Sequence, residues 1–240
     1  AIESVNTPLT SLLPDYFSML RDPDTLQINL HHVLSMSTGL EWNDSRDWID
    51  WSESSDWTAN LLQHRQAYQP GRVFEYCTAC SHLLSEALTR TNGHKPLDYA
   101  QKHLFEPLNI QPGKWLKSPQ GIHAGGHGLH LKPRDMAKIG LLMQQQGRWD
   151  NNQIIPAEWI AISTTPYTKA NDWLGYGYQW WTFSANGLNS YYASGYGGQI
   201  IWVTPALKLI VVVTSTTENY VENINMPKLI FKRLLGMEIL

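Results

Sequence analysis

A tyrosine and a glycine-rich segment carry the residue types that acyl-transfer chemistry could use. Tyr76 follows a Pro-Gly turn at 70–71. A phenol titrates near pH 10, so it can act as a base near neutrality only beside cationic groups. The segment A-S-G-Y-G-G at 193–198 follows a stretch with strand periodicity, and its glycines would let the backbone approach a ligand closely. The simpler interpretations are a buried tyrosine and a bulged hairpin.

Two further patterns could support metal or redox chemistry, and each has a simpler interpretation. Cys77 and Cys80 form C-x-x-C, but they open an expected helix and lie in no βαβ unit, which favours packing of two small residues. His123, His127 and His130 form H-x3-H-x2-H in a glycine-rich segment, where loop packing or pocket lining is favoured. We therefore expect no metal and no cofactor. A thiol or metal hydrolase using these residues stays open as a third hypothesis.

The segment 41–57 is rich in tryptophan and acid. It holds four tryptophans and six acidic residues against the single Arg46. The tryptophans could grip an apolar or cationic substrate group, or they could anchor an acidic surface loop to the core. Trp180 and Trp181 pose the same question on a strand, where alternation lets only one of them face a cleft.

Composition limits the class of protein. The chain has 240 residues, of which 42% are hydrophobic and 16% charged, which suits a globular fold with a substantial core. A net charge of −3 gives no basic excess for nucleic acid or an anionic membrane. The strongly apolar stretches 200–203 and 209–213 are too short to span a bilayer. The chain opens without methionine, so we expect it to begin after processing or partway through a longer product.

The elements that must position these residues change character along the chain. Apolar spacing is mostly helical up to about residue 165 and indicates strands after about 175. We expect region 1–165 to be mainly helical with cleft-lining loops, and region 166–240 to form an antiparallel sheet with a C-terminal helix. This is an α+β pattern. The expected helices are 31–37, 78–91, 133–146, 156–162 and 223–235, and the expected strands are 176–183, 191–194, 199–203 and 207–214.

Four segments of the sequence form a recognisable series. The first is I-N-L-H-H-V-L-S-M-S-T-G-L at 28–40, and the second is P-G-R-V-F-E-Y-C-T at 70–78. The third is A-G-G-H-G-L at 124–129 with R-D-M-A-K-I-G, G-R-W and I-I-P-A-E-W at 134–140, 147–149 and 154–159. The fourth is Y-G-Y-Q-W-W at 176–181 with A-S-G-Y-G-G-Q at 193–199. In this order they resemble the serine β-lactamase and penicillin-binding-protein superfamily, and within it class C β-lactamase-type esterases and amide hydrolases, including the 6-aminohexanoate-dimer hydrolase group.

The resemblance implies a β-lactamase/transpeptidase-like fold and roles for particular residues. It assigns proton relay to the phenol of Tyr76, and by alignment with the family's Lys-Thr-Gly strand it makes the backbone N–H of Tyr196 an oxyanion donor. Ala193 replaces the lysine and Thr78 replaces a frequent asparagine. Both departures point away from penicillins and leave an esterase or amidase. The expected substrate-binding residues are Thr78, Trp181, His127, Ser194, Gly195 and Gly197.

The family's nucleophile is missing from this sequence. No serine is followed three positions later by lysine, so the S-x-x-K motif is absent. In the family this motif and the first strands of the sheet lie upstream of the matching segments. We therefore expect a serine hydrolase, acting on a small ester or amide through an acyl-enzyme, of which this chain alone is inactive. The alternative is a non-catalytic relative that keeps the cleft for binding.

Two further expectations follow from that resemblance. A sheet without its first strands would expose an edge, so we expect an N-terminal segment or another chain to complete it. Relatives are often periplasmic or secreted, which is the only guide to compartment.

Overall fold

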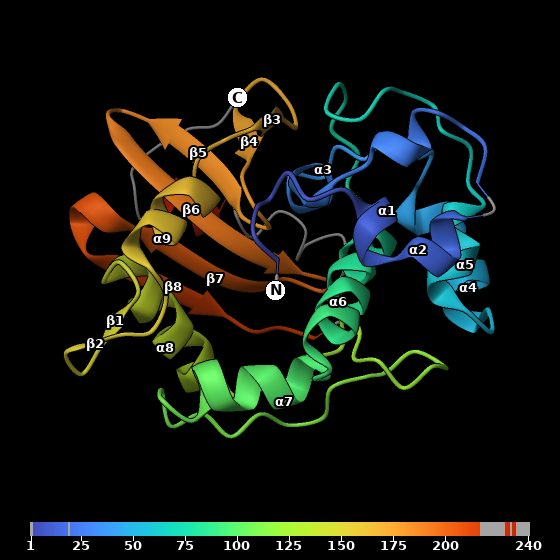
Figure 1. The fold of residues 1–240 in the computed structure, drawn as a ribbon. Coiled ribbons are helices and arrows are strands. Elements are labelled where there is room, and N and C mark those ends of the chain that lie inside the picture. Colours follow the sequence, from blue (N-terminus) through green and yellow to red (C-terminus); the bar gives the residue numbers. More distant parts are fainter. Residues whose placement is uncertain (1, 19, 217–228, 231, 234–240) are drawn as a thin grey trace.

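A computed structural model describes residues 2–18, 20–216, 229–230 and 232–233. A six-stranded antiparallel sheet lies on one side, a group of helices lies on the other, and α6 runs between them (Figure 1). The expected α+β class is confirmed. The helices are α1 (Leu9–Leu12), α2 (Pro14–Phe17), α3 (Leu30–Leu34), α4 (Asp44–Glu53), α5 (Trp57–Leu62), α6 (Thr78–Asn92), α7 (Pro96–Ala100), α8 (Pro133–Gln144) and α9 (Ala157–Ser163). Within the described ranges, no helix is long and apolar enough to cross a membrane.

The sheet has a simple meander topology. Its strands follow chain order, and each is antiparallel to the next. They are β3 (Thr168–Lys169), β4 (Leu174–Tyr176), β5 (Trp181–Ala185), β6 (Leu188–Gly195), β7 (Gln199–Thr204) and β8 (Leu209–Val213), and a separate small hairpin joins β1 (Arg148–Trp149) to β2 (Asn152–Gln153). The strands β6 and β7 match the expected 191–194 and 199–203 closely.

The expected strand 176–183 is wrong, because the chain reverses within it. β4 ends at Tyr176 and β5 begins at Trp181, and these two residues are paired across the hairpin. Gln179 has φ 64°, which a strand does not allow. A Cβ on Gly177 would lie 2.3 Å from the carbonyl oxygen of Ser163, so glycine permits this connection to pack closely against the end of α9.

Helix α6 forms where the sequence predicts it. The Cys77 sulfur accepts a hydrogen bond from the Cys80 N–H at the start of the helix, and Gly93 ends it in the left-handed conformation with φ 68°. Its buried face includes Ala79, Leu83 and Ala87, which belong to the main apolar core beneath α1, α3 and α5. The helix thus ties its first residues to the centre of the molecule.

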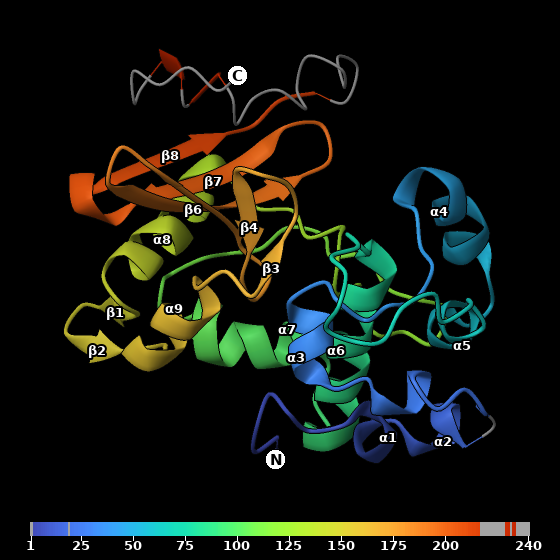
Figure 2. The same ribbon diagram turned by 90° about the horizontal axis from the view of Figure 1, so that it is seen from above.

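The helices α8 and α9 cover one face of the sheet, as Figure 2 shows. Gly140 lets α8 lie close, since a Cβ there would be 2.7 Å from a methyl carbon of Ile210. The apolar spacing changes from helical to strand-like near residue 165, but the chain is not divided in space there. The helices α8 and α9 precede this position and pack on the sheet that follows it. The expected C-terminal helix lies largely outside the described residues; Ile230 is buried beside Trp202 in an apolar cluster on the sheet.

Segment 41–57 forms helices that the sequence reading treats as a loop. Asn43 accepts hydrogen bonds from the Ser45 and Arg46 N–H groups and so caps α4. Asp56 accepts from the Ala59 N–H and caps α5. Asparagine and aspartate are favoured at this position because their side chains satisfy the first free N–H groups of a helix.

Candidate active site

Tyr76 lies immediately before α6, at one end of a column of aromatic rings. Its ring stacks on Trp181 with centroids 5.6 Å apart and planes 17° apart. Trp181 in turn stacks on Tyr192 at 6.2 Å, and Tyr192 on Trp202 at 4.8 Å, with planes 12° and 11° apart. These contacts fix the plane of the Tyr76 ring against the sheet. Trp180 packs on Tyr191 instead, so the two adjacent tryptophans take opposite faces as alternation predicts.

Burial and charge keep the Tyr76 phenol protonated. Burial, and to a lesser degree the nearby carboxylate of Asp44, raise the pKa of Tyr76 to about 12. A phenol needs a cation beside it to act as a base near neutrality. Among the described residues, no cation lowers the pKa of Tyr76. In this chain, Tyr76 near neutrality is therefore a proton donor and no base.

Asp44, the first residue of α4, connects that helix to the start of α6. Its Oδ1 accepts the Thr78 backbone N–H at 3.1 Å, and its Oδ2 accepts the Thr78 hydroxyl at 2.6 Å. The Trp42 indole N–H also donates to Asp44 Oδ1. A carboxylate at a helix N-terminus is additionally stabilised by the helix dipole. The sequence analysis did not identify Asp44 as a site residue. The only feature that could have indicated it is its position as an acidic residue directly after Asn43, a potential helix cap.

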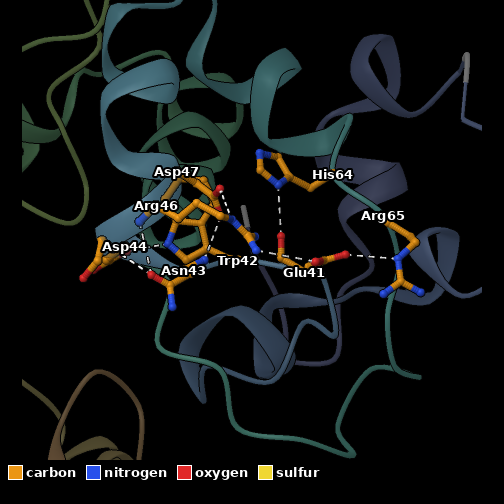
Figure 3. Close-up of polar contacts among 9 residues, drawn as sticks. Glu41, Trp42, Asn43, Asp44, Arg46, Asp47, His64 and Arg65 are labelled. Atoms are coloured by element: carbon orange, nitrogen blue, oxygen red, sulfur yellow. Dashed lines mark hydrogen bonds and ion pairs between the residues drawn. The ribbon is translucent and has the colours of Figure 1, made fainter.

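The tryptophans of this segment mainly anchor it to the core. Trp42, Trp51 and Trp57 are 2%, 1% and 5% exposed and pack in the main apolar core, while Trp48 is half-buried. Two of the other acids pair with arginines: Glu41 contacts both Arg46 and Arg65, and Asp47 pairs with Arg46 (Figure 3). These exposed pairs stabilise the fold little.

The three histidines of the H-x3-H-x2-H pattern have different surroundings. The His127 ring lies 4.6 Å from Trp48 and near His82, and burial lowers the pKa of both histidines, that of His82 to about 4. His123 packs on Trp115 instead, and His130 is exposed. Over the described part of the chain, no group of three potential ligands could hold a metal ion. The hypothesis of a metal hydrolase built on this pattern therefore has no geometric basis.

Cys77 and Cys80 are joined by a disulfide and are almost fully buried. The sequence reading of two packing residues is thus corrected: they do pack, but as a cross-linked pair at the start of α6. A sulfur held in a disulfide is no nucleophile. This pairing contradicts a thiol hydrolase that uses Cys77.

The glycine-rich strand end lies next to the aromatic column. The last pair between β5 and β6 is Trp181 with Tyr192. Residues 193–195 therefore extend past β5, and in the described part of the chain they pair only with β7. Alternation puts Ser194 on the same face as Tyr192. Tyr196 begins the turn to β7, and this turn contains Gly197 with φ 78°. An unpaired strand edge of this kind can bind an extended ligand backbone.

The structure thus brings the predicted site residues together in two groups. Tyr76, Thr78 and Trp181 surround the start of α6, and His127 lies within electrostatic range of Asp44. The second group, Ser194, Gly195, Tyr196 and Gly197, lies along the end of β6 and its turn. A groove of about 980 Å³ lies elsewhere, between the end of α9 and strands β4 to β6, and none of these residues lines it.

Comparison with known proteins identifies the family and the fold of this chain. The Beta-lactamase family model matches residues 2–234. A 6-aminohexanoate-dimer hydrolase from Paenarthrobacter ureafaciens is 22% identical over 154 residues, which cover 60% of this chain and 39% of that protein. The chain therefore spans well under two thirds of the length of this curated relative.

Two solved structures show the same fold. The octameric penicillin-binding protein homologue from Pyrococcus abyssi has a TM-score of 0.75 at 20% identity, covering 98% of this chain and 61% of that one. A penicillin-binding protein from Bacillus halodurans has a TM-score of 0.69 at 19% identity, covering 92% and 77%. With a family match over nearly all of its length and an α+β fold shared with these structures, the chain belongs to the Beta-lactamase family of hydrolases.

Proposed function

We propose that the whole protein hydrolyses a small ester or amide through an acyl-enzyme, with a serine nucleophile supplied from outside these 240 residues. The observation that carries this is the position of Tyr76, which lies on the family's catalytic motif and is oriented by stacking on Trp181. A buried, oriented phenol next to a helix start suits proton transfer to a leaving group.

In this proposal the remaining groups bind substrate. The open edge at 193–195 would pair with the substrate backbone, and the Tyr196 N–H would donate to the developing oxyanion. The substrate site would be lined by Thr78, Trp181, His127, Ser194, Gly195 and Gly197. The lysine that follows the nucleophile in the family motif would bring the cation that Tyr76 lacks here and would lower its pKa.

The test compares the 240-residue chain with the whole gene product after treatment with a fluorophosphonate probe. We expect one adduct by intact mass on the whole product and none on the chain, and we expect the adduct to lie on a serine followed by x-x-Lys. Absence of an adduct on the whole product, together with no turnover of aryl esters and anilides, would contradict the proposal.

One observation favours a second function, a binding module without catalysis. The Tyr76 phenol is desolvated and lies beside a carboxylate, which is the reverse of what a base needs. A non-catalytic relative would keep the cleft and bind the same class of ligand. Binding of an ester or amide by the whole product without turnover or adduct would support this alternative.

A further inference from the structure

Thr78 donates both of its hydrogen bonds, from the backbone N–H and from the hydroxyl, to a single side chain. Its N–H and its hydroxyl proton both point to the Asp44 carboxylate, at 3.1 and 2.6 Å. A threonine hydroxyl has one proton and two acceptor sites. A carboxylate can only accept, so the direction of the hydroxyl bond is fixed. The Thr78 oxygen keeps its acceptor sites, and the residue is 9% exposed.

The contact is well supported on the Asp44 side. Asp44 opens α4, and the Trp42 indole N–H holds its Oδ1. The carboxylate also lies at the start of α6, where the helix dipole favours negative charge. Rotation of the Thr78 hydroxyl away from Asp44 would leave a carboxylate oxygen short of a partner, which is costly in a half-buried place.

We infer that Asp44 is a positioning residue that makes Thr78 a pure hydrogen-bond acceptor and so favours substrates that present an N–H to it. This rests on the proposed function, and it narrows the substrate class from esters and amides to amides. An amide N–H would donate to the Thr78 oxygen. An ester has an oxygen in place of this N–H, and its lone pairs would repel those of the Thr78 oxygen. A site that accepts a hydrogen bond from the substrate therefore disfavours the ester.

The experiment uses the whole protein and a matched pair of substrates, an anilide and the aryl ester that differs only in N–H replaced by oxygen. For each variant, the ratio of kcat/KM for the amide to kcat/KM for the ester is divided by the same ratio for the wild type. This division cancels the higher intrinsic reactivity of the ester. We expect Asp44→Asn and Thr78→Val each to lower the amide-to-ester ratio by about tenfold, the size of one lost hydrogen bond at a charged site.

Asp47→Asn is the matched control. Asp47 lies on the same helix, but its carboxylate pairs with Arg46 and has no contact with Thr78. It should leave the ratio within about twofold. If Asp44→Asn instead lowers kcat/KM for both substrates equally, the residue is only structural and the inference is wrong.

A second measurement needs no activity. In the 240-residue chain, thermal unfolding of Asp44→Asn, Thr78→Val and the double variant tests the contact itself. We expect the Tm loss of the double variant to be clearly smaller than the sum of the single losses, because both remove the same hydrogen bond. Additive losses would overturn the inference, whereas a whole protein that hydrolyses neither substrate would overturn the proposed function.

Discussion

At the scale of single residues, Tyr76 combines a fixed ring with a hydroxyl held in its neutral form. The stack on Trp181 fixes the ring, while burial and Asp44 raise the pKa to about 12. These two properties can be separated by substitution, because phenylalanine keeps the ring and loses the proton.

We predict that Tyr76→Phe lowers kcat of the whole protein by about 100-fold or more, the usual contribution of a proton-transferring side chain. The Tm should fall little, since the stack with Trp181 remains. The control is Tyr192→Phe, which removes a hydroxyl from the same aromatic column two rings away. Steady-state kinetics and thermal unfolding of both variants test this. Equal losses of activity in the two would show that the column acts only as packing.

His82 is a second residue whose environment has a measurable effect. It is 2% exposed, lies between Trp51 and Trp57, and faces His127 and the carboxylate of Asp56. Burial, and to a lesser degree His127, lower the pKa of His82 to about 4, although Asp56 acts in the opposite direction. In the unfolded chain the pKa is about 6.5.

Between these two values the unfolded chain binds more protons, so stability must fall as the pH falls. The contribution is fully present above about pH 6.5 and is lost by about pH 4, to a total of about 3 kcal/mol. We predict that His82→Leu flattens this part of the pH dependence of unfolding free energy. His103→Gln, at an exposed histidine, should leave the slope as it is. An unchanged slope in His82→Leu would show that His82 is not the group responsible.

At the scale of elements, α6 depends on a buried charge near its C-terminal end. The Glu86 side chain is 3% exposed and pairs with Arg90 at 2.8 Å, one turn later. Arg90 also contacts Asp15 at 3.0 Å and lies 5.0 Å from the centre of the Tyr16 ring. This network joins α6 to α2.

We predict that Arg90→Ala destabilises the chain by about 2–3 kcal/mol, because it leaves the Glu86 carboxylate buried and unpaired. Arg65→Ala is the matched control: Arg65 pairs with Glu41 at 3.0 Å, but its side chain is 73% exposed, so the loss should stay below about 1 kcal/mol. Urea unfolding of the three proteins gives the comparison. Equal losses would mean that Glu86 finds water or another partner.

The elements that could be predicted from the sequence are those whose first and last residues are determined by nearby residues, such as a proline or a glycine. Gly93 ends α6 and Pro133 starts α8, and both helices lie within two residues of their expected bounds. The hairpin at Gly177 could not be predicted in this way, because it depends on close packing against Ser163, distant in sequence. The same holds for the site: a motif identifies Tyr76, but the bond from Thr78 to Asp44 exists only after folding.

At the scale of the whole molecule, β8 is the last strand of the sheet among the residues that the structure describes. This strand is the outermost in the order of the sheet, and all five of its residues are half-exposed. A groove of about 300 Å³ between α8 and β8 is lined by Ala137, Leu141, Ile210 and Val212 with Arg134 and Lys138. An apolar edge strand next to an apolar groove is a surface on which another strand can pair.

We therefore predict that the 240-residue chain self-associates through β8, and that a product extended upstream does not. Val212→Lys should suppress association of the shorter chain, because a charge on the edge strand opposes pairing. Val73→Lys is a control at a half-buried valine that belongs to no strand. Sedimentation velocity over a range of concentrations measures this. In the extended product, amide exchange in β8 should slow, since its outward N–H groups would gain partners. A monodisperse short chain with slow exchange in β8 would contradict the prediction and would mean that its edge is already covered.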